Sequence, residues 1–347
     1  MRNLITFTVV FVLCFLNIDA QSLIQSGPMV GYSSMREAGI WIQTTQSADV
    51  AIRFWKQDSS DFKKVTQTLT TNMDNHYVAH ITAHPLEPGH TYQYEVIIDG
   101  KIMSIPYPLQ FKSQPLWQWR HDAPNFSFVA GSCVYVSDSM YDRPGEPYGG
   151  DYHIFNTIDQ DNPDFMVWLG DNTYLREADW DSKFGIYYRH KHTRSLKNLQ
   201  PLLGRTHHYA IWDDHDYGPN DSDRSFVLKN TTLQAFKDFW FNPVYHAGES
   251  KGITGQFTWH DCDFFLLDNR WYRTPHDSSG QIIGDEQLTW LKEALINSKA
   301  SFKFICIGGQ FISDLKAFEN HAQYPEERQQ ILSMLNDIQV KNVVFLN

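Results

Sequence analysis

Short runs in which apolar and polar residues alternate occupy residues 22–113. The runs lie at 39–44, 49–55, 77–82 and 91–98, and the turn-forming pair Asp99-Gly100 follows the last of them. Alternation with a period of two is typical of strands with one buried face, and several short strands at this spacing favour a sandwich. We therefore predict an N-terminal all-β sandwich over residues 22–113.

From residue 125 onward, apolar runs are separated by stretches with helical periodicity. The expected strands are 126–130, 165–169, 209–212, 264–267, 302–307 and 343–346. The expected helices are 152–159, 180–193, 232–241, 286–298 and 325–336. This alternation predicts an α/β layered domain over residues 125–347. The connecting segment contains Trp117 and Trp119, which we expect to pack the two domains together, with sugar binding as the alternative.

The first twenty residues have the pattern of a secretory signal. Arg2 precedes an apolar run from Leu4 to Leu16, and Ala20 is a suitable last residue before cleavage. No later run is apolar enough to span a membrane stably. We therefore predict that residues 1–20 are a signal peptide and that the protein is secreted or periplasmic.

Charge and cysteine content narrow the functional classes. The chain has 29 Lys and Arg residues against 40 Asp and Glu residues, a formal net charge of −11. This excess argues against binding to a nucleic-acid backbone. An anionic small substrate remains compatible, because bound cations reverse the local sign of charge. Once the signal is removed, three cysteines remain, and we expect Cys262 and Cys306 to be buried core residues.

Reactive residues follow three of the predicted strands. The motifs are Gly131-Ser132-Cys133, Gly170-Asp171-Asn172-Thr173-Tyr174 and Asp213-Asp214-His215-Asp216. Ligands of open α/β sheets bind beyond the carboxyl ends of the strands, so these motifs are expected at one edge. Closely spaced carboxylates repel one another unless a cation is present. A solvated acidic turn explains residues 213–216 equally well when they stand alone, but three such motifs in order favour a metal site.

The residue types in these motifs suit two different cations. A carboxylate such as Asp171 can bridge two ions, whereas a Cys133 thiolate and a Tyr174 phenolate suit a transition metal of higher charge. Oxygen atoms of Asp214 and Asn220 suit a harder ion such as calcium. A pair of metal ions is a common solution for the attack of water on phosphorus. The pattern therefore predicts a two-metal site that hydrolyses a phosphate ester.

Neighbouring residues are candidates for catalysis and substrate binding. We expect His215 and Asp216 to act in catalysis, with His215 stabilising or protonating the departing alkoxide. We expect three residues to contact phosphate: Asn172, Arg270 and Arg273. The alternatives are turn stabilisation by Asn172 and salt bridges from the arginines to Asp268 or Asp263.

Two further acidic residues are expected to have other roles. We expect Asp213 to brace the loop or His215 instead of binding metal. Glu319 follows a polar loop, and we expect it to be a solvated surface residue, with contact to a substrate loop as the alternative.

The catalytic part of the chain resembles the alkaline phosphatase D (PhoD-like) family of calcineurin-like metallophosphoesterases. The resemblance rests on the three strand-end motifs, on Trp212 before the third, and on two later runs, Leu267-Asp268-Asn269-Arg270-Trp271-Tyr272-Arg273 and Gly308-Gly309-Gln310. An N-terminal β-sandwich also fits this family. Within that sandwich, residues 86–94 resemble the strand corner of fibronectin type III modules, which carry a Tyr there.

The resemblance implies an extracytoplasmic phosphomonoesterase or phosphodiesterase that uses Fe³⁺ and Ca²⁺, with zinc or manganese as alternatives. It implies that Cys133, Asp171 and Tyr174 bind iron. It further implies that Asp171 bridges to calcium and that Asp214 or Asn220 completes the calcium site. The expected substrate is a small-molecule or lipid phosphate ester.

One departure from the family pattern concerns the last predicted strand, 343–346. In the family, a Gly-Asp-x-His-His-type motif follows this strand, whereas the present sequence ends at Asn347. We therefore expect a C-terminally truncated phosphoesterase domain that binds metal weakly. The alternative function is a non-catalytic exported binding module. A purple acid phosphatase relative fits less well, because residues 213–216 lack the Gly-Asn-His-Glu pattern.

Overall fold

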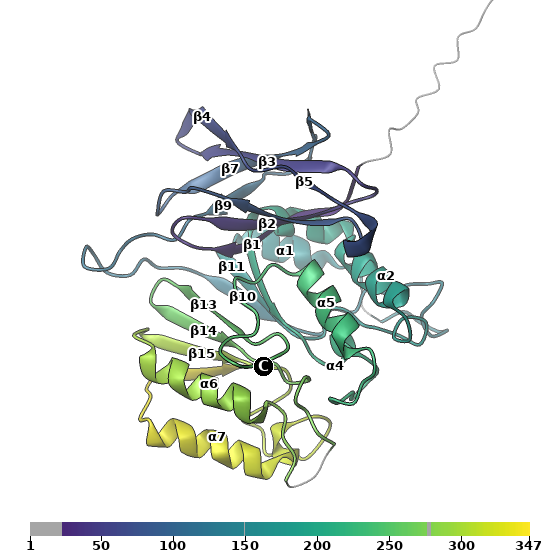
Figure 1. Cartoon of the computed structure of the whole chain (residues 1–347), viewed down its shortest axis with the longest axis vertical. Coiled ribbons are helices and arrows are strands. Elements are labelled where there is room, and N and C mark those ends of the chain that lie inside the picture. Colours follow the sequence, from purple (N-terminus) through teal and green to yellow (C-terminus); the bar gives the residue numbers. More distant parts are fainter. Residues whose placement is uncertain (1–22, 149, 276–278) are drawn as a thin grey trace, which may run out of the picture.

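The computed structural model describes residues 23–148, 150–275 and 279–347, so the predicted signal peptide lies outside the described residues. Within them, the strands form three sheets. Figure 1 shows the sheet that contains β3 and β7 at one end, the sheet that contains β13–β15 toward the other, and β1, β2, β10 and β11 between them.

The middle sheet joins strands from both predicted domains. Its order is β10-β11-β12-β1-β2-β6. These strands are β10 (Phe128–Gly131), β11 (Phe165–Leu169), β12 (His207–Ile211), β1 (Ile24–Ser33), β2 (Ala38–Thr44) and β6 (Val78–Ala83). β1 runs parallel to β12, with Val30 opposite His207. One sheet therefore continues from the N-terminal strands into the α/β part.

The two outer sheets enclose the middle one. The N-terminal outer sheet contains β3 (Asp49–Lys56), β4 (Ser59–Val65), β5 (Leu69–Thr70), β7 (Thr91–Ile98), β8 (Lys101–Ile102) and β9 (Gln110–Lys112). The C-terminal outer sheet contains β13 (Gly255–Trp259), β14 (Cys262–Leu266), β15 (Phe302–Cys306) and β16 (Val343–Leu346). β14, β15 and β16 are parallel, and β13 pairs antiparallel with β14.

Helices follow the strands largely where the periodicity predicts them. They are α1 (His153–Asp161), α2 (Lys183–Arg194), α3 (Gln200–Arg205), α4 (Asp214–Tyr217), α5 (Lys229–Phe239), α6 (Gly284–Asn297) and α7 (Pro325–Asp337). Short 3-10 turns lie at η1 (Met73–Asn75), η2 (Lys197–Leu199) and η3 (His321–Gln323). Within the described residues, no helix combines the length and apolarity needed to cross a membrane. The strands and helices that the sequence predicts are present, but β1, β4, β5, β8, β9, β13, α3 and α4 were not foreseen.

β2 differs from the alternating strand that its sequence predicts, because all seven of its residues are buried. Ile40 and Ile42 belong to the core between the two N-terminal sheets, whereas Trp41 belongs to the core beneath the helices. The Trp41 indole donates to the carbonyl of Asp238 in α5 at 2.7 Å, and the Arg194 guanidinium of α2 lies 5.8 Å from its ring. β2 is therefore covered on both faces, by a sheet and by helices.

Aromatic side chains form the core between the middle and C-terminal sheets. Tyr209 of β12 stacks on Phe257 of β13 at 3.6 Å, and Phe128 of β10 meets Phe264 of β14 edge to face at 5.5 Å. Cys262 and Cys306 are buried, as predicted, and both are free. This packing fixes the ends of the middle and C-terminal sheets relative to each other.

The two linker tryptophans do not behave alike. Trp117 is partly buried, whereas Trp119 is fully exposed at 102% of its reference area. The expectation that both pack the domains together is therefore wrong for Trp119. The connection between the two parts depends instead on shared strand pairing and on His207, which bonds to the carbonyl of Gly31 and accepts from the backbone N–H of Lys112.

Candidate functional site

Three loops meet at the carboxyl ends of β10, β11 and β12. The backbone N–H groups of Cys133 and Val134 donate to the carbonyls of Gly170 and Asp171, at 3.2 and 2.8 Å. The N–H of His215 donates to Oδ1 of Asp171 at 3.3 Å. The three predicted motifs are therefore linked to one another directly, and their predicted convergence is confirmed.

The second loop comes unusually close to the third. Gly170 has a φ of 99°, and a Cβ at this position would lie 2.7 Å from Cβ of Asp213. A side chain would therefore push the third loop away, which explains why glycine is required here. Asp171 and Cys133 also have left-handed backbones, with φ values of 53° and 61°. Such conformations in non-glycine residues cluster at functional sites.

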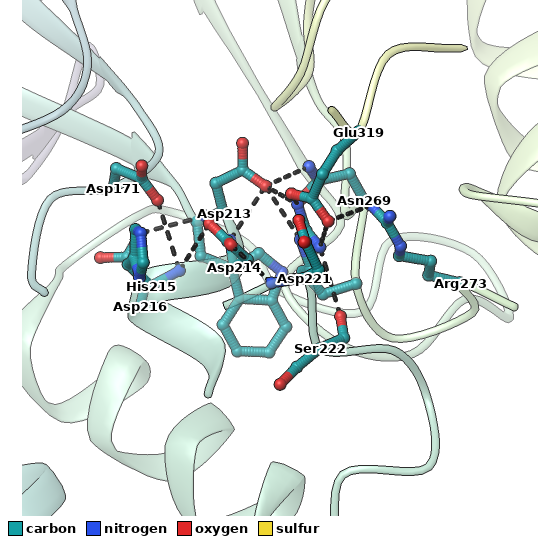
Figure 2. Close-up of polar contacts among 12 residues, drawn as sticks. Asp171, Asp213, Asp214, His215, Asp216, Asp221, Ser222, Asn269, Arg273 and Glu319 are labelled. Carbon is teal, nitrogen blue, oxygen red and sulfur yellow. Dashed lines mark hydrogen bonds and ion pairs between the residues drawn. The ribbon is translucent and has the colours of Figure 1, made fainter. Parts of the chain in front are cut away.

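Asp171 lies at the centre of the site. Its Oδ2 accepts from the Tyr174 hydroxyl at 3.0 Å and lies 3.8 Å from Sγ of Cys133. Ligand atoms of Asp171, Asp214 and His215 all lie within 4.8 Å of one another. Figure 2 shows Asp213 and Asp214 between Asp171 on one side and Glu319 on the other. The structure thus brings four of the five predicted metal ligands to one place.

The charge of this site favours a bound cation. Burial and the carboxylates of Asp213, Asp214 and Asp216 raise the pKa of Asp171 to about 9. Burial also raises the pKa of the Tyr174 phenol well above its usual range. A cation offsets the repulsion between the carboxylates and favours deprotonation of such ligands. The donor set of carboxylates, thiol and phenol therefore suits a bound metal ion.

Polar atoms without partners support the same conclusion. Nδ1 of His215, Oδ1 of Asn172 and Oδ1 of Asp216 are buried and make no hydrogen bond within the described residues. Most buried polar atoms have a partner, so each of these needs an explanation. Three such atoms around one carboxylate cluster are consistent with a bound ion, water or substrate.

His215 lies beside the Tyr174 ring, with the ring centroids 4.4 Å apart. Its backbone N–H is shared between Asp171 and Asp214. Burial lowers the pKa of His215, and the nearby Arg176 charge adds to this effect. At neutral pH its imidazole is therefore neutral and is suited to donating one hydrogen bond to a charged oxygen.

Asp216 and Asn172 lie next to the carboxylate cluster and bond to the backbone of its loops. Asp216 is 0% exposed, and its Oδ2 accepts from the backbone N–H groups of Asp213 and Asn172 at 3.0 and 3.2 Å. Asn172 donates its amide to the carbonyl of Ile211 at 2.7 Å. Both residues hold the loops together through these bonds. A catalytic role for Asp216 and a phosphate contact for Asn172 stay predictions, and the loop-stabilising alternative describes the bonds that are present.

Asn220 is exposed at the surface of the third loop. The adjacent Asp221 donates its backbone N–H to Oδ2 of Asp214 at 2.8 Å. This bond holds the Asn220 backbone beside Asp214. Metal binding by the Asn220 side chain stays a prediction.

Arg270 is fully buried and bonded to two acids. It donates from Nε to Oδ1 of Asp213 at 2.8 Å and from Nη1 to Oε1 of Glu319 at 2.6 Å. Arg273 also pairs with Glu319, at 2.6 Å. The alternative partners, Asp268 and Asp263, are not the side-chain partners of Arg270. The expectation that Glu319 is a solvated surface residue is wrong, because it is the shared counter-ion of two buried arginines.

The site contains a second group of acidic residues, which differs from the group around Asp171 because an arginine is paired with it. Oxygen atoms of Asp213, Asp214 and Glu319 also lie within 4.8 Å of one another. The Arg270 guanidinium already neutralises Asp213 and Glu319, so a metal ion there would have to displace it. We place the candidate metal site at Asp171 for this reason. Phosphate binding by Arg270 and Arg273 stays a prediction, since carboxylates hold them here.

Comparisons with known proteins agree with this geometry. The family model described as PhoD-like phosphatase matches residues 128–347, and a domain of unknown function matches residues 21–115. No curated protein sequence matches the chain.

Two solved structures share the fold. A structure of PhoD has a TM-score of 0.75 and 18% identity, over 94% of this chain and 71% of that one. Purple acid phosphatase PPD1 from yellow lupin (Lupinus luteus) seeds has a TM-score of 0.64 and 13% identity, over 93% of this chain and 58% of that one. The metallophosphoesterase fold is therefore shown. Because the family model covers more than half of its length, the chain belongs to the PhoD-like phosphatase family.

Proposed function

We propose that this protein is an extracytoplasmic, metal-dependent phosphatase or phosphodiesterase that hydrolyses small-molecule or lipid phosphate esters. The observation that carries the proposal is the meeting of Cys133, Asp171, Tyr174 and Asp214 at the ends of three adjacent strands. Family membership supports the phosphoesterase activity. The apolar run that follows Arg2 supports export through a signal peptide.

In this proposal Cys133, Asp171 and Tyr174 hold Fe³⁺, and Asp171 and Asp214 hold Ca²⁺ with help from Asn220. Zinc and manganese are the alternative ions. Such cations, when bound, supply positive charge to the phosphoryl oxygens and activate water for attack on phosphorus. The remaining residues position this chemistry: Asp216 and Asn172 fix the loops, and Arg270 binds Asp213.

His215 is the proposed hydrogen-bond donor to the leaving oxygen. Its ring lies beside Tyr174, and its Nδ1 has no partner within the described residues. A neutral imidazole in this position stabilises an alkoxide as the phosphorus–oxygen bond breaks.

The test is hydrolysis of 4-nitrophenyl phosphate and bis(4-nitrophenyl) phosphate by the full-length protein, together with elemental analysis of the purified protein. We expect iron and calcium to be present and Asp171→Ala to abolish turnover. Asp181→Ala, at an exposed position outside the site, is the matched control. Hydrolysis by Asp171→Ala at the wild-type rate would falsify the proposal, as would a purified, active protein that contains no metal.

A further inference from the structure

A cavity lies apart from the carboxylate site. It has a volume of about 670 Å³, and residues of the β1–β2 turn, the linker before β10, the segment between α5 and β13, β13 and α6 line it. We call it the junction cleft, after the linker that it borders. None of the predicted metal ligands lines it. Its size lies within the range of small-molecule sites, roughly 300–1,000 Å³.

Two tryptophans line the junction cleft from distant parts of the chain. Trp117 belongs to the linker, and Trp290 belongs to α6. Both are only partly buried, so each leaves some indole surface accessible. A partly exposed indole offers a flat apolar surface together with an N–H donor, a combination that recurs at recognition sites.

Three glutamines line the same cleft: Gln114, Gln118 and Gln256. Oε1 of Gln118 is buried and makes no hydrogen bond within the described residues. Each amide supplies two donors and one acceptor. A ligand that carries hydroxyl groups can both donate to and accept from the amides that border the cleft.

Two ionisable side chains that line the cleft, Glu37 and His260, already make hydrogen bonds within the protein. The Glu37 carboxylate accepts from the Tyr32 hydroxyl at 2.9 Å. Nδ1 of His260 bonds to the carbonyl of Pro124 at 2.7 Å. No lysine or arginine is among the described residues that line the cleft. A phosphate or carboxylate ligand would therefore find no counter-charge, whereas an uncharged polar ligand needs none.

We propose that the junction cleft binds a neutral carbohydrate chain. Sugar rings present flat faces of C–H groups, which pack on indole surfaces such as those of Trp117 and Trp290. Their edges carry hydroxyl groups, each of which is both a donor and an acceptor and so pairs with amides. The proposal is independent of the phosphoesterase activity, because it uses none of the residues of the metal site.

The experiment titrates the full-length protein with three uncharged probes, cellohexaose, maltohexaose and N-acetylchitohexaose, followed by tryptophan fluorescence and calorimetry. We expect saturable binding of at least one probe. Trp117→Ala should weaken it at least about tenfold, the loss of one good contact. Trp119→Ala is the matched control, because Trp119 lies two residues away, is fully exposed and does not line the cleft. The affinity of Trp119→Ala for the bound probe should equal that of the wild type.

A second variant keeps the test decisive if Trp117→Ala misfolds. Gln256→Leu keeps the approximate size of the side chain but removes the amide, and it should also weaken binding while phosphatase activity is unchanged. The proposal is overturned if no probe binds, if both variants bind as the wild type does, or if Trp119→Ala weakens binding as much as Trp117→Ala. Competition by inorganic phosphate would equally overturn it, because the cleft would then recognise an anion.

Discussion

Arg270 donates its Nε–H to Oδ1 of Asp213 across 2.8 Å, and this bond joins the loop after β12 to the loop after β14. The same carboxylate oxygen accepts from the amide of Asn269 at 2.6 Å. Asp213 is thereby held by the C-terminal sheet, whereas Asp214 beside it lies with Asp171. The middle and C-terminal sheets are thus connected at the site itself, through the buried guanidinium of Arg270.

Glu319 is the first position at which this arrangement can be tested. We expect Glu319→Gln to lower the free energy of unfolding by about 3 kcal/mol, because removal of one partner leaves buried arginine charge uncompensated. Arg270 and Arg273 would both lose a counter-ion. Chemical denaturation at neutral pH measures the effect.

The matched control for that prediction is Glu293→Gln. Glu293 is exposed on α6, so its substitution should change stability by less than about 0.5 kcal/mol. Equal stability of Glu319→Gln and Glu293→Gln would show that the ion pairs of Glu319 contribute nothing to the fold.

Asp171 gives opposite predictions for activity and for stability. Burial and neighbouring carboxylates raise its pKa to about 9 in the folded protein, from an ordinary value of 3.8. In metal-free protein, its contribution to stability is therefore full below pH 3.8 and is lost as the pH rises toward 9. Asp171→Asn removes this ionisation, so at pH 8 it should raise the Tm of the metal-free protein by about 1–2 °C, equivalent to ~1 kcal/mol.

The same variant should lose phosphatase activity, because an amide cannot replace the shared carboxylate. Differential scanning calorimetry with EDTA and a phosphatase assay without it measure the two effects. Asp181→Asn, at an exposed position, should change neither. A Tm of Asp171→Asn below that of the wild type at pH 8 would contradict the assigned repulsion.

Sequence patterns predicted the meeting of the strand-end residues well because it depends on local order. Each of Cys133, Asp171 and Asp214 follows an apolar run, and parallel strands carry the residues after such runs to one edge. The limits of most strands and helices also followed from periodicity. These features require only the nearest neighbours in the chain.

The features that the sequence did not reveal depend on contacts between distant segments. The parallel pairing of Val30 with His207 joins strands 177 positions apart in the chain, and no local pattern announces it. In the sequence, Glu319 has the pattern of a polar loop residue. Only the fold places Arg270 and Arg273 beside it. The burial of both arginines is the observation that would have predicted an acidic partner, since buried guanidinium groups require one.

His215 can be tested through the leaving group of the substrate. If its imidazole stabilises the departing oxygen, His215→Asn should slow hydrolysis of an alkyl phosphate about 100-fold or more. Hydrolysis of 4-nitrophenyl phosphate should slow far less, because its leaving group departs without a proton. Tyr174→Phe is the comparison, since loss of a proposed metal ligand should slow both substrates equally. Equal losses for both substrates in His215→Asn would remove the leaving-group role.

His207 predicts an acid sensitivity that is independent of the metal site. The residue is buried where β12, β1 and β9 meet. Its Nδ1 bonds to the carbonyl of Gly31 at 2.7 Å, and its Nε2 accepts from the N–H of Lys112 at 3.0 Å, so it is held in one neutral tautomer. Burial lowers its pKa from 6.5 to about 4. Its stabilising contribution is therefore complete above pH 6.5 and is lost as the pH falls toward 4, by up to about 1.4 kcal/mol per pH unit.

We expect His207→Gln to be less stable than the wild type at pH 7.5, because the two hydrogen bonds are disturbed. The difference should narrow as the pH is lowered to 5, since glutamine carries no proton that opposes folding. Denaturation of both proteins with EDTA at several pH values measures this convergence. His153→Gln, on the exposed surface of α1, should run parallel to the wild type at every pH. A constant difference between His207→Gln and the wild type from pH 7.5 to 5 would mean that His207 keeps an ordinary pKa in the folded protein.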